Sequence, residues 1–213
     1  MSRPRKDSSL MDTAVRERML AEALRLFVES GYAATSVREI VEAAGVSKPV
    51  LYYYFSSKEG LYLEIMAGIS RLFDQQIDAL HTTAGSVRQR LLNLFTGMFD
   101  GALENLAVVR LVFSIYFGPP QGAPFVDFNR FFDQTVVTVD ALISEGMAGG
   151  EISACNSTAL CWSLVGSYHT ILEEQICHTP PRINRDGLIA VITQILDGVA
   201  PKAPRCESQG ARF

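Results

Sequence analysis

A short stretch of the sequence, residues 48–54, holds one lysine and three consecutive tyrosines. Successive residues of a helix are about 100° apart around its axis, so Tyr52, Tyr53 and Tyr54 cannot all face inward, and at least one must project to solvent. Exposed tyrosine hydroxyls and the ammonium group of Lys48 are suited to hydrogen bonds with phosphate oxygens and with the edges of bases. These side chains therefore favour contact with nucleic acid.

Two short predicted helices, residues 37–44 and residues 48–55, would position these side chains. The preceding threonine or serine can cap the first helix, Gly45 ends it, and Ser47 can cap the second. Pro49 falls in the first turn of the second helix, where its missing N–H does no harm. Two short helices joined by a tight glycine-containing turn are typical of a helix-turn-helix, although any small three-helix bundle has this pattern. The apolar residues spaced to lock the two helices together are Ile40, Ala43, Val46 and Leu51.

Helical periodicity dominates the rest of the chain, and signals for strands are weak and scattered. The helix before the short pair is predicted over residues 13–30, because Asp12 or Thr13 can cap its start and Gly31 is placed to end it. The expected fold class is therefore all-α. The helices predicted after the short pair cover residues 58–81, 87–99, 103–117, 124–145, 157–177 and 185–199.

Charge is distributed unevenly along the 213 residues, whose net charge is −4. Residues 1–58 hold nine Lys or Arg and seven Asp or Glu, so that this part carries +2. Residues 59–213 hold ten and sixteen, so that this part carries −6. A change of sign between two parts of a chain indicates a segment that binds nucleic acid joined to a segment with another role.

Residues 16–66 resemble, in unbroken register, the DNA-binding domain of the TetR/AcrR family of transcriptional regulators. The resemblance implies a homodimer with an N-terminal three-helix helix-turn-helix domain and a C-terminal helical domain for ligand binding and dimerisation. It also implies that the third helix lies in the major groove of DNA. The segments that carry the resemblance are Gly31-Tyr32, Thr35-Ser36-Val37, Ala44-Gly45-Val46-Ser47-Lys48, Leu51-Tyr52-Tyr53-Tyr54-Phe55 and Lys58-Glu59.

The resemblance further implies which side chains contact DNA. Pro49 and Val50 depart from the family, in which a small residue and a hydroxyl residue are common at these positions. Neither side chain donates a hydrogen bond, so both suit thymine methyl groups, and polar discrimination should concentrate on the tyrosines and on Arg38 and Lys48, each on guanine. Tyr53 would either pack or bind phosphate. The predicted DNA-binding residues are Thr35, Ser36, Val37, Arg38, Ser47, Lys48, Pro49, Val50, Tyr52, Tyr53, Tyr54 and, on phosphate, Lys58.

The chain is expected to begin with a basic arm that contains Arg3, Arg5 and Lys6. This arm would either lie in the minor groove beside the site or add sequence-independent affinity through phosphate contacts. The expected parts of the chain are a basic flexible arm (residues 1–11), the helix-turn-helix DNA-binding domain (12–57), the helical effector-binding and dimerisation domain (58–200) and a disordered tail (201–213).

Aromatic side chains are concentrated in residues 92–132. They are either ordinary core or the lining of a pocket, since pockets in helical domains are mostly apolar with a few polar groups. A pocket of this kind would bind a small apolar or aromatic effector. The predicted ligand-binding residues are Phe95, Phe99, Arg110, Phe113, Tyr116, Phe117, Phe128, Phe132, Trp162, Tyr168, His169 and Glu173.

The last two predicted helices contain small residues that permit close helix approach, namely Ala159, Gly166 and Ala190. The family resemblance implies that these helices pack against their twins in a homodimer. A two-fold dimer matches double-stranded palindromic operator DNA, because its two DNA-binding domains meet two half-sites about one helical turn apart.

The sequence lacks the nucleophile elbow, phosphate loop, metal-ligand helix and dinucleotide turn of common enzymes, so neither enzyme activity nor a cofactor is expected. Cys155, Cys161, Cys177 and Cys206 are expected to be free thiols without the tight spacing of a metal site. A helical adaptor or ligand-binding protein that has lost operator binding is the alternative function.

The N-terminus has no apolar run after its basic residues, so no signal peptide is predicted. No segment approaches the ~18 uninterrupted apolar residues that a membrane span requires. The sequence therefore predicts a soluble, cytoplasmic protein that does not enter a membrane.

Overall fold

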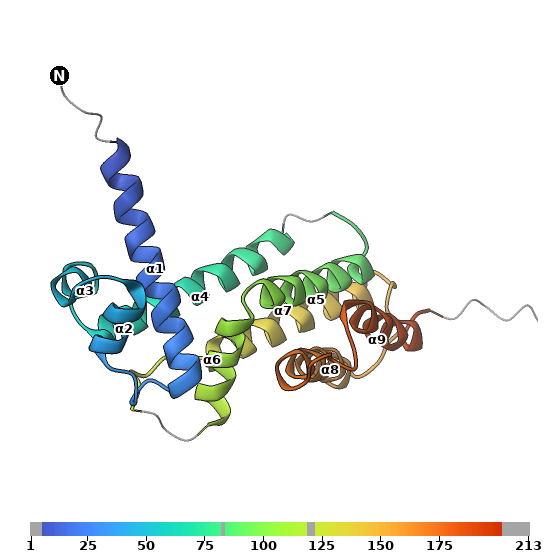
Figure 1. Cartoon of the computed structure of the whole chain (residues 1–213). Helices are drawn as coiled ribbons and strands as arrows, with labels where there is room; N and C mark the ends of the chain where they lie inside the picture. Colours follow the sequence, from blue (N-terminus) through green and yellow to red (C-terminus); the bar gives the residue numbers. More distant parts are fainter. Residues whose placement is uncertain (1–5, 82–83, 119–121, 202–213) are drawn as a thin grey trace, which may run out of the picture. The chain divides into compact units, whose positions relative to one another are not determined.

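The computed structural model describes residues 6–81, 84–118 and 122–201, and these residues form helices and no strand, which confirms the predicted all-α class (Figure 1). Residues that carry the predicted basic arm before Lys6 and the predicted tail after Pro201 lie outside the described residues. The helices are α1 (Lys6–Ser30), α2 (Val37–Ala44), α3 (Lys48–Phe55), α4 (Lys58–His81), α5 (Val87–Glu104), α6 (Leu106–Phe117), α7 (Asn129–Ala148), α8 (Ser157–Cys177) and α9 (Arg185–Gly198).

The chain divides into two compact units. The first contains the described residues up to 81 together with residues 98–133, and therefore holds α1 to α4, α6 and the start of α7. The second contains the described residues of 82–97 and those from 134 onward, and therefore holds most of α7 and all of α8 and α9. None of the helices in the described part of the chain combines the length and the apolarity that a membrane span requires. The functional boundary expected after residue 57 stays a prediction.

Local sequence features begin and end α2 and α3 as expected. The Ser36 hydroxyl accepts a hydrogen bond from the Glu39 N–H at 3.2 Å, and the Glu39 carboxylate accepts one from the Ser36 N–H at 2.7 Å, which completes a capping box. Gly45 ends α2 with a φ of 62°, a left-handed conformation that glycine adopts at little cost. Ser47 holds the N-cap position of α3 in extended conformation, and Pro49 lies in the first turn.

A cluster of buried apolar side chains holds α1 to α4 together, and Ile40 and Leu51 lie at its centre with no exposed surface. The prediction that Ala43 belongs to this core is wrong, because Ala43 is exposed. The buried face of α2 is formed instead by Ile40, Val41 and Ala44. At about 100° per residue, Ala43 lies about 60° from Ile40 on the side away from Val41 and Ala44, and therefore falls outside the buried face.

Six helix boundaries differ from the prediction. The smaller differences are that α6 begins at Leu106 rather than residue 103, α7 ends at Ala148 rather than residue 145, and α9 ends at Gly198 rather than residue 199. α1 begins at Lys6 rather than at residue 13, because no proline or glycine interrupts residues 7–12 and a helix needs no polar cap to continue. α5 continues through Gly97 and Gly101 to Glu104 rather than ending at residue 99. α7 begins at Asn129 rather than at residue 124, and the non-helical segment before it includes Phe128, whose side chain is 8% exposed.

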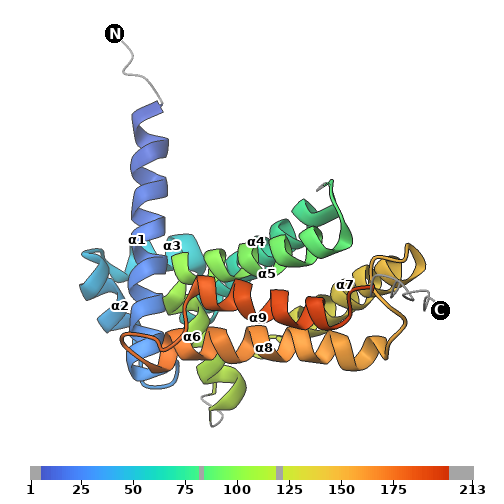
Figure 2. The same ribbon diagram turned by 90° about the vertical axis from the view of Figure 1, so that its right-hand side faces the viewer.

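The second unit is organised around α8 and α9, which lie side by side in Figure 2. Their buried faces have helical spacing, and Leu164 and Ile192 on them have no exposed surface. Glu174, which is 8% exposed, closes the α8–α9 connection because its carboxylate accepts hydrogen bonds from the Arg182 backbone N–H at 2.9 Å and from the guanidinium at 2.6 and 2.8 Å. These bonds hold the pKa of Glu174 well below its usual range, at about 2.

Candidate nucleic-acid interface

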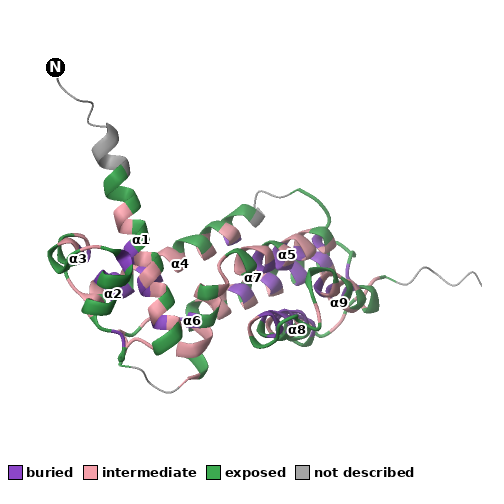
Figure 3. Ribbon diagram, viewed as in Figure 1, coloured by how far each residue is buried: buried purple, intermediate pink, exposed green. Residues whose placement is uncertain are grey.

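The polar side chains of α3 lie on its outer surface, where Figure 3 shows the helix coloured mainly as exposed. Tyr53 is 78% exposed and Tyr52 is 48% exposed, while Leu51 and Phe55 are buried beneath them. Lys48 is also exposed, and it forms no ion pair or hydrogen bond with the described residues. The expected outward projection of at least one tyrosine is thus confirmed for two of the three.

Tyr54 is half-buried, and its hydroxyl donates a hydrogen bond to the carboxylate of Asp12 in α1. This hydrogen bond raises the pKa of Tyr54 to about 12, so the phenol stays protonated. The Tyr54 ring also lies edge-to-face against Tyr53, with 5.0 Å between the ring centroids. The predicted helix cap at Asp12 or Thr13 is wrong, because both residues lie within α1, and the contact of Asp12 with α3 joins residues too far apart for sequence spacing to predict.

The start of α2 contributes two exposed polar side chains of the four residues predicted there. Ser36 is exposed as the helix cap, and Arg38 projects to solvent, where its guanidinium pairs with Glu42 at 2.7 Å. An exposed pair of this kind contributes little stability, so another acceptor can replace Glu42. Thr35 is buried instead, because its hydroxyl donates to the backbone carbonyl of Gly31 at 2.9 Å. It therefore holds the turn that leads into α2.

The valines of the predicted set, Val37 and Val50, are half-buried, whereas Ser47 and Pro49 are exposed at the start of α3. Both valines pack against the apolar cluster of the first unit. Val50 therefore has only part of its side chain available for an apolar contact outside the protein, while Pro49 presents its ring more fully.

Lys58 lies at the start of α4, where its ammonium group fixes the connection between α1 and α2. It donates to the backbone carbonyls of Tyr32 and Thr35 at 2.9 Å each and lies 4.1 Å from the centroid of the Tyr32 ring. Burial lowers the pKa of this half-buried lysine. Two of its three N–H donors are used within the protein, which leaves one for a phosphate oxygen.

Two arginines of α1 that the sequence did not single out support the short helices. The Arg18 guanidinium donates to the Ala44 carbonyl at 2.7 Å and so places a cation at the C-terminus of α2, where the helix dipole is negative. Arg16 pairs with Glu64 of α4 at 2.7 Å and lies 5.6 Å from the Phe55 ring centroid. Spacing along the sequence cannot show these contacts, since each joins separate helices.

The twelve residues predicted to bind an effector are divided between the two compact units. In the second unit, Phe95 and Tyr168 are buried and pack together with 5.7 Å between their ring centroids. In the same unit, His169 is half-buried, and Trp162 and Glu173 are exposed on α8. The seven in the first unit are the buried Phe99 and Phe128, the half-buried Phe113 and Phe132, and the exposed Arg110, Tyr116 and Phe117.

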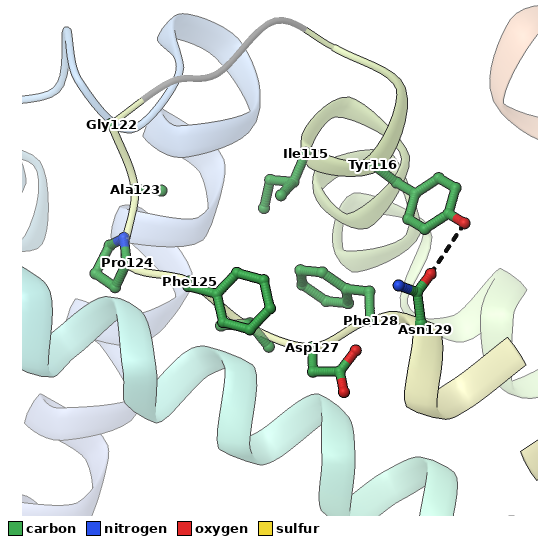
Figure 4. A pocket seen from close by; sticks show the side chains of 10 residues that line it. Ile115, Tyr116, Gly122, Ala123, Pro124, Phe125, Asp127, Phe128 and Asn129 are labelled. Atoms are coloured by element: carbon green, nitrogen blue, oxygen red, sulfur yellow. Dashed lines mark hydrogen bonds between the residues drawn. The ribbon is translucent and has the colours of Figure 1, made fainter. Parts of the chain in front are cut away.

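Two of the seven, Tyr116 and Phe128, line a pocket of about 390 Å³ between the end of α6 and the segment that leads into α7 (Figure 4). The Tyr116 hydroxyl donates to the side-chain oxygen of Asn129 at 3.1 Å across this pocket. The remaining lining residues are Ile115, Gly122, Ala123, Pro124, Phe125, Val126 and Asp127. The prediction of effector-binding residues thus stays a prediction, with two of its members placed at this pocket.

The described cysteines Cys155, Cys161 and Cys177 are free thiols, as expected. Within the described part of the chain no group of three or more His, Cys, Asp or Glu side chains is placed to hold a metal ion. The arrangement in the first unit is instead a helix-turn-helix that exposes hydrogen-bond donors and aromatic rings on its second helix.

Comparison with known proteins identifies this helix-turn-helix. Residues 19–65 match the model of the family of bacterial regulatory proteins called the tetR family, so this part of the chain is similar to that family. The matched residues run from α1 through α2 and α3 into α4. The resemblance seen in the sequence is thereby confirmed.

The curated relatives are transcriptional regulators. The chain is 40% identical over 110 residues to the transcriptional activator FasR of Mycolicibacterium smegmatis, an alignment that covers 51% of this chain and 50% of FasR. It is 27% identical over 146 residues to the transcriptional repressor KstR2 of the same organism, which covers 68% of this chain and 70% of KstR2. The chain thus matches about half the length of FasR.

Solved structures share the fold over most of the chain. A TetR-like transcriptional regulator from Rhodococcus sp. RHA1 aligns with a TM-score of 0.66 and 19% identity, covering 92% of this chain and 96% of that chain. At this identity the likeness shows the all-helical fold and carries no information about the ligand.

Proposed function

We propose that the protein is a sequence-specific DNA-binding transcriptional regulator that places α3 in the major groove of its operator. The exposed face of α3, which combines Lys48, Pro49, Tyr52 and Tyr53 in a tetR-family domain, carries this proposal. An α-helix fits the major groove, where each base pair presents a distinct pattern of donors and acceptors. Since bacterial DNA lies in the cytoplasm, the protein acts there.

Specific recognition would rest on few side chains. Lys48 and Arg38 would each donate to guanine, and Arg38 would exchange its exposed partner Glu42 for the base. Tyr52 and Tyr53 would donate to phosphate oxygens or base edges, while Pro49 would contact thymine methyl groups.

Three further side chains would have indirect roles within the proposed interface. Tyr54 would act by tying α3 to Asp12, because its hydroxyl is already bonded there. Thr35 would hold the turn before α2. Lys58 would hold the same connection and offer its remaining N–H to phosphate.

The proposed homodimer would form through α8 and α9. Along the exposed face of α8 the hydroxyls of Ser163, Ser167 and Thr170 donate to carbonyls of their own helix at 2.7 to 3.0 Å. These hydroxyls therefore require no external partner when the face is covered. Gly166 lies on this face with open space where a Cβ would project, which permits the close approach of a second helix. A two-fold dimer would bind a palindromic operator.

The proposed outcome of DNA binding is repression that a small apolar or aromatic effector relieves. KstR2 is described as a repressor, which supports repression rather than activation. An effector that favours a conformer with low operator affinity must itself bind less tightly to the DNA-bound protein, by the same factor. FasR is described as an activator, so activation is the second candidate.

A reporter experiment tests the proposal. The DNA upstream of the gene would drive a reporter in a bacterial host, with the wild-type protein or with a variant that carries Lys48→Ala and Tyr53→Ala supplied in trans. Repression predicts lower reporter output with the wild type than with the variant, and activation predicts the reverse. Equal output, together with no binding to this DNA at low salt, would exclude a regulator of this promoter and favour the adaptor alternative.

A further inference from the structure

The pocket beside the α6–α7 connection has the size of a small-molecule site. Its volume of about 390 Å³ falls within the range of ligand pockets, roughly 300–1,000 Å³. Tyr116 is 52% exposed and Phe125 is 89% exposed, so aromatic rings border its open side. Figure 4 shows the Phe125 and Phe128 side chains on the segment that leads into α7, and both line the pocket.

The charge of this pocket distinguishes between classes of ligand. Asp127 carries the only formal charge among the described lining residues, and it is exposed. It forms no salt bridge with the described residues, because Arg130, the cation that follows it in the chain, binds Asp74 at 2.6 and 2.7 Å and attracts Asp127 only at longer range. A carboxylate among aromatic rings attracts a cation, because ring faces and carboxylate are both negative. The same carboxylate repels carboxylate and phosphate ligands.

We infer that this pocket binds a small apolar organic cation, of the quaternary onium or protonated-amine class. The apolar part of such a molecule would lie against Ile115, Phe125 and Phe128, and its positive charge would lie beside Asp127 at the solvent-exposed side. The site lies within the first compact unit and differs from the aromatic cluster of Phe95 and Tyr168 in the second.

One wall of the pocket belongs to the core of the DNA-binding helices. Phe128 is 8% exposed and is part of the same buried cluster as Ile40 of α2 and Leu51 of α3. Its ring also lies 6.1 Å from that of Phe131, which lies 5.0 Å from that of Phe73 in α4. A ligand that displaces Phe128 must therefore alter packing around the helix-turn-helix, so its binding is linked to operator affinity. This link rests on the proposed function, whereas the site itself does not.

Two ions of equal shape and opposite charge, tetraphenylphosphonium and tetraphenylborate, test the site by calorimetric titration of the full-length protein without DNA. The cation should bind at least tenfold more tightly than the anion. Asp127→Asn should weaken cation binding about fivefold, as expected for one solvent-exposed charge interaction. Phe125→Ala should weaken it roughly threefold to tenfold through the lost ring face. The matched control is Asp133→Asn, which removes an exposed carboxylate outside the pocket and should leave both affinities unchanged.

Two results would overturn the site: equal affinity for the two ions, or an equal loss of cation binding in Asp127→Asn and Asp133→Asn. Operator binding measured on the same samples separates the two proposals. If the cation binds through Asp127 and the protein binds no DNA, the site stands and the proposed function fails. If the protein binds its operator and the cation fails the Asp127 test, the proposed function stands and the site fails.

Discussion

The helix pairs α2–α3 and α8–α9 present opposite kinds of surface. α2 and α3 have eight residues each and cover a small core. They expose a lysine, an arginine that forms an ion pair with a glutamate, and two tyrosines. α8 and α9 are longer, bury most of their large apolar residues and expose small residues whose hydroxyls are satisfied within the helix. The first surface offers donors to a polar ligand, and the second offers a close-packing face to another protein. The difference supports the proposal that one pair recognises DNA and the other joins subunits.

The largest effect is expected from the core that supports the short pair. Leu51→Ala would remove a side chain with no exposed surface and should lower the free energy of unfolding by about 3 kcal/mol, as for other buried leucines. Denaturant unfolding measures this loss. Leu72→Ala, at a leucine that is 49% exposed, is the matched control and should lower the free energy of unfolding by well under half as much. Equal losses for both variants would contradict the described core.

The proposed subunit surface can be disrupted without damage to the protomer. Gly166→Leu adds a bulky side chain at a position where an added Cβ meets no neighbouring side chain or segment within 4 Å, so the protomer should stay folded while the dimer dissociates. Analytical ultracentrifugation should show at least a tenfold rise in the dissociation constant. Gly198→Leu, at the end of α9 and also in open space, should leave the dimer intact. A monomeric wild type, or an unchanged dimer in Gly166→Leu, would contradict the proposal that α8 forms the subunit interface.

Low pH should destabilise the α8–α9 connection, because it protonates the Glu174 carboxylate. The pKa of this carboxylate is about 2 in the folded protein and lies nearer the ordinary value of ~4.3 in the unfolded chain. Its stabilising contribution is therefore present above pH ~4.3 and is lost as the pH falls towards 2. Denaturant unfolding at pH 6 and pH 3 should show a smaller loss of stability in Glu174→Gln than in the wild type. An identical pH dependence would contradict this role.

The smallest effect concerns the link between α3 and α1. Tyr54→Phe removes the hydroxyl that binds Asp12 and retains the ring, so α3 should stay folded and operator affinity should fall only a few-fold. Tyr53→Phe is the matched variant, because it removes a phenol hydroxyl proposed to contact DNA directly. Fluorescence anisotropy with labelled operator compares the two. A loss for Tyr54→Phe that depends strongly on salt would indicate a phosphate contact instead of a positioning role.

The sequence predicted best those structural features that depend on residues close together in the chain. The boundaries of α2 and α3 depend on Ser36, Gly45 and Pro49, which lie next to the helices that they begin or end. α8 was likewise predicted with its observed bounds, since Asn156 caps it and its apolar residues recur with helical spacing. The family resemblance added the expected role of α3.

Features that depend on tertiary contacts were not predictable. The burial of Thr35 and the engagement of Lys58 both arise from backbone carbonyls that only the folded α1–α2 connection brings near. The pocket at the α6–α7 connection depends on a non-helical segment that was expected to be the first turn of α7. Spacing along the sequence accordingly gives no signal for Asp127, because its proposed role depends on the aromatic rings that line the same pocket.

The central claim is that α3 recognises specific bases, and the most direct measurement is the binding of wild-type and Lys48→Ala protein to operator duplexes substituted base by base. If Lys48 contacts guanine, the variant should lose about tenfold or more on the operator and should no longer distinguish the base at one position of each half-site. Arg71→Ala, an exposed cation of α4, is the control for loss of charge. Equal weakening of Lys48→Ala on every sequence, with base preferences intact, would show a phosphate contact and contradict the account.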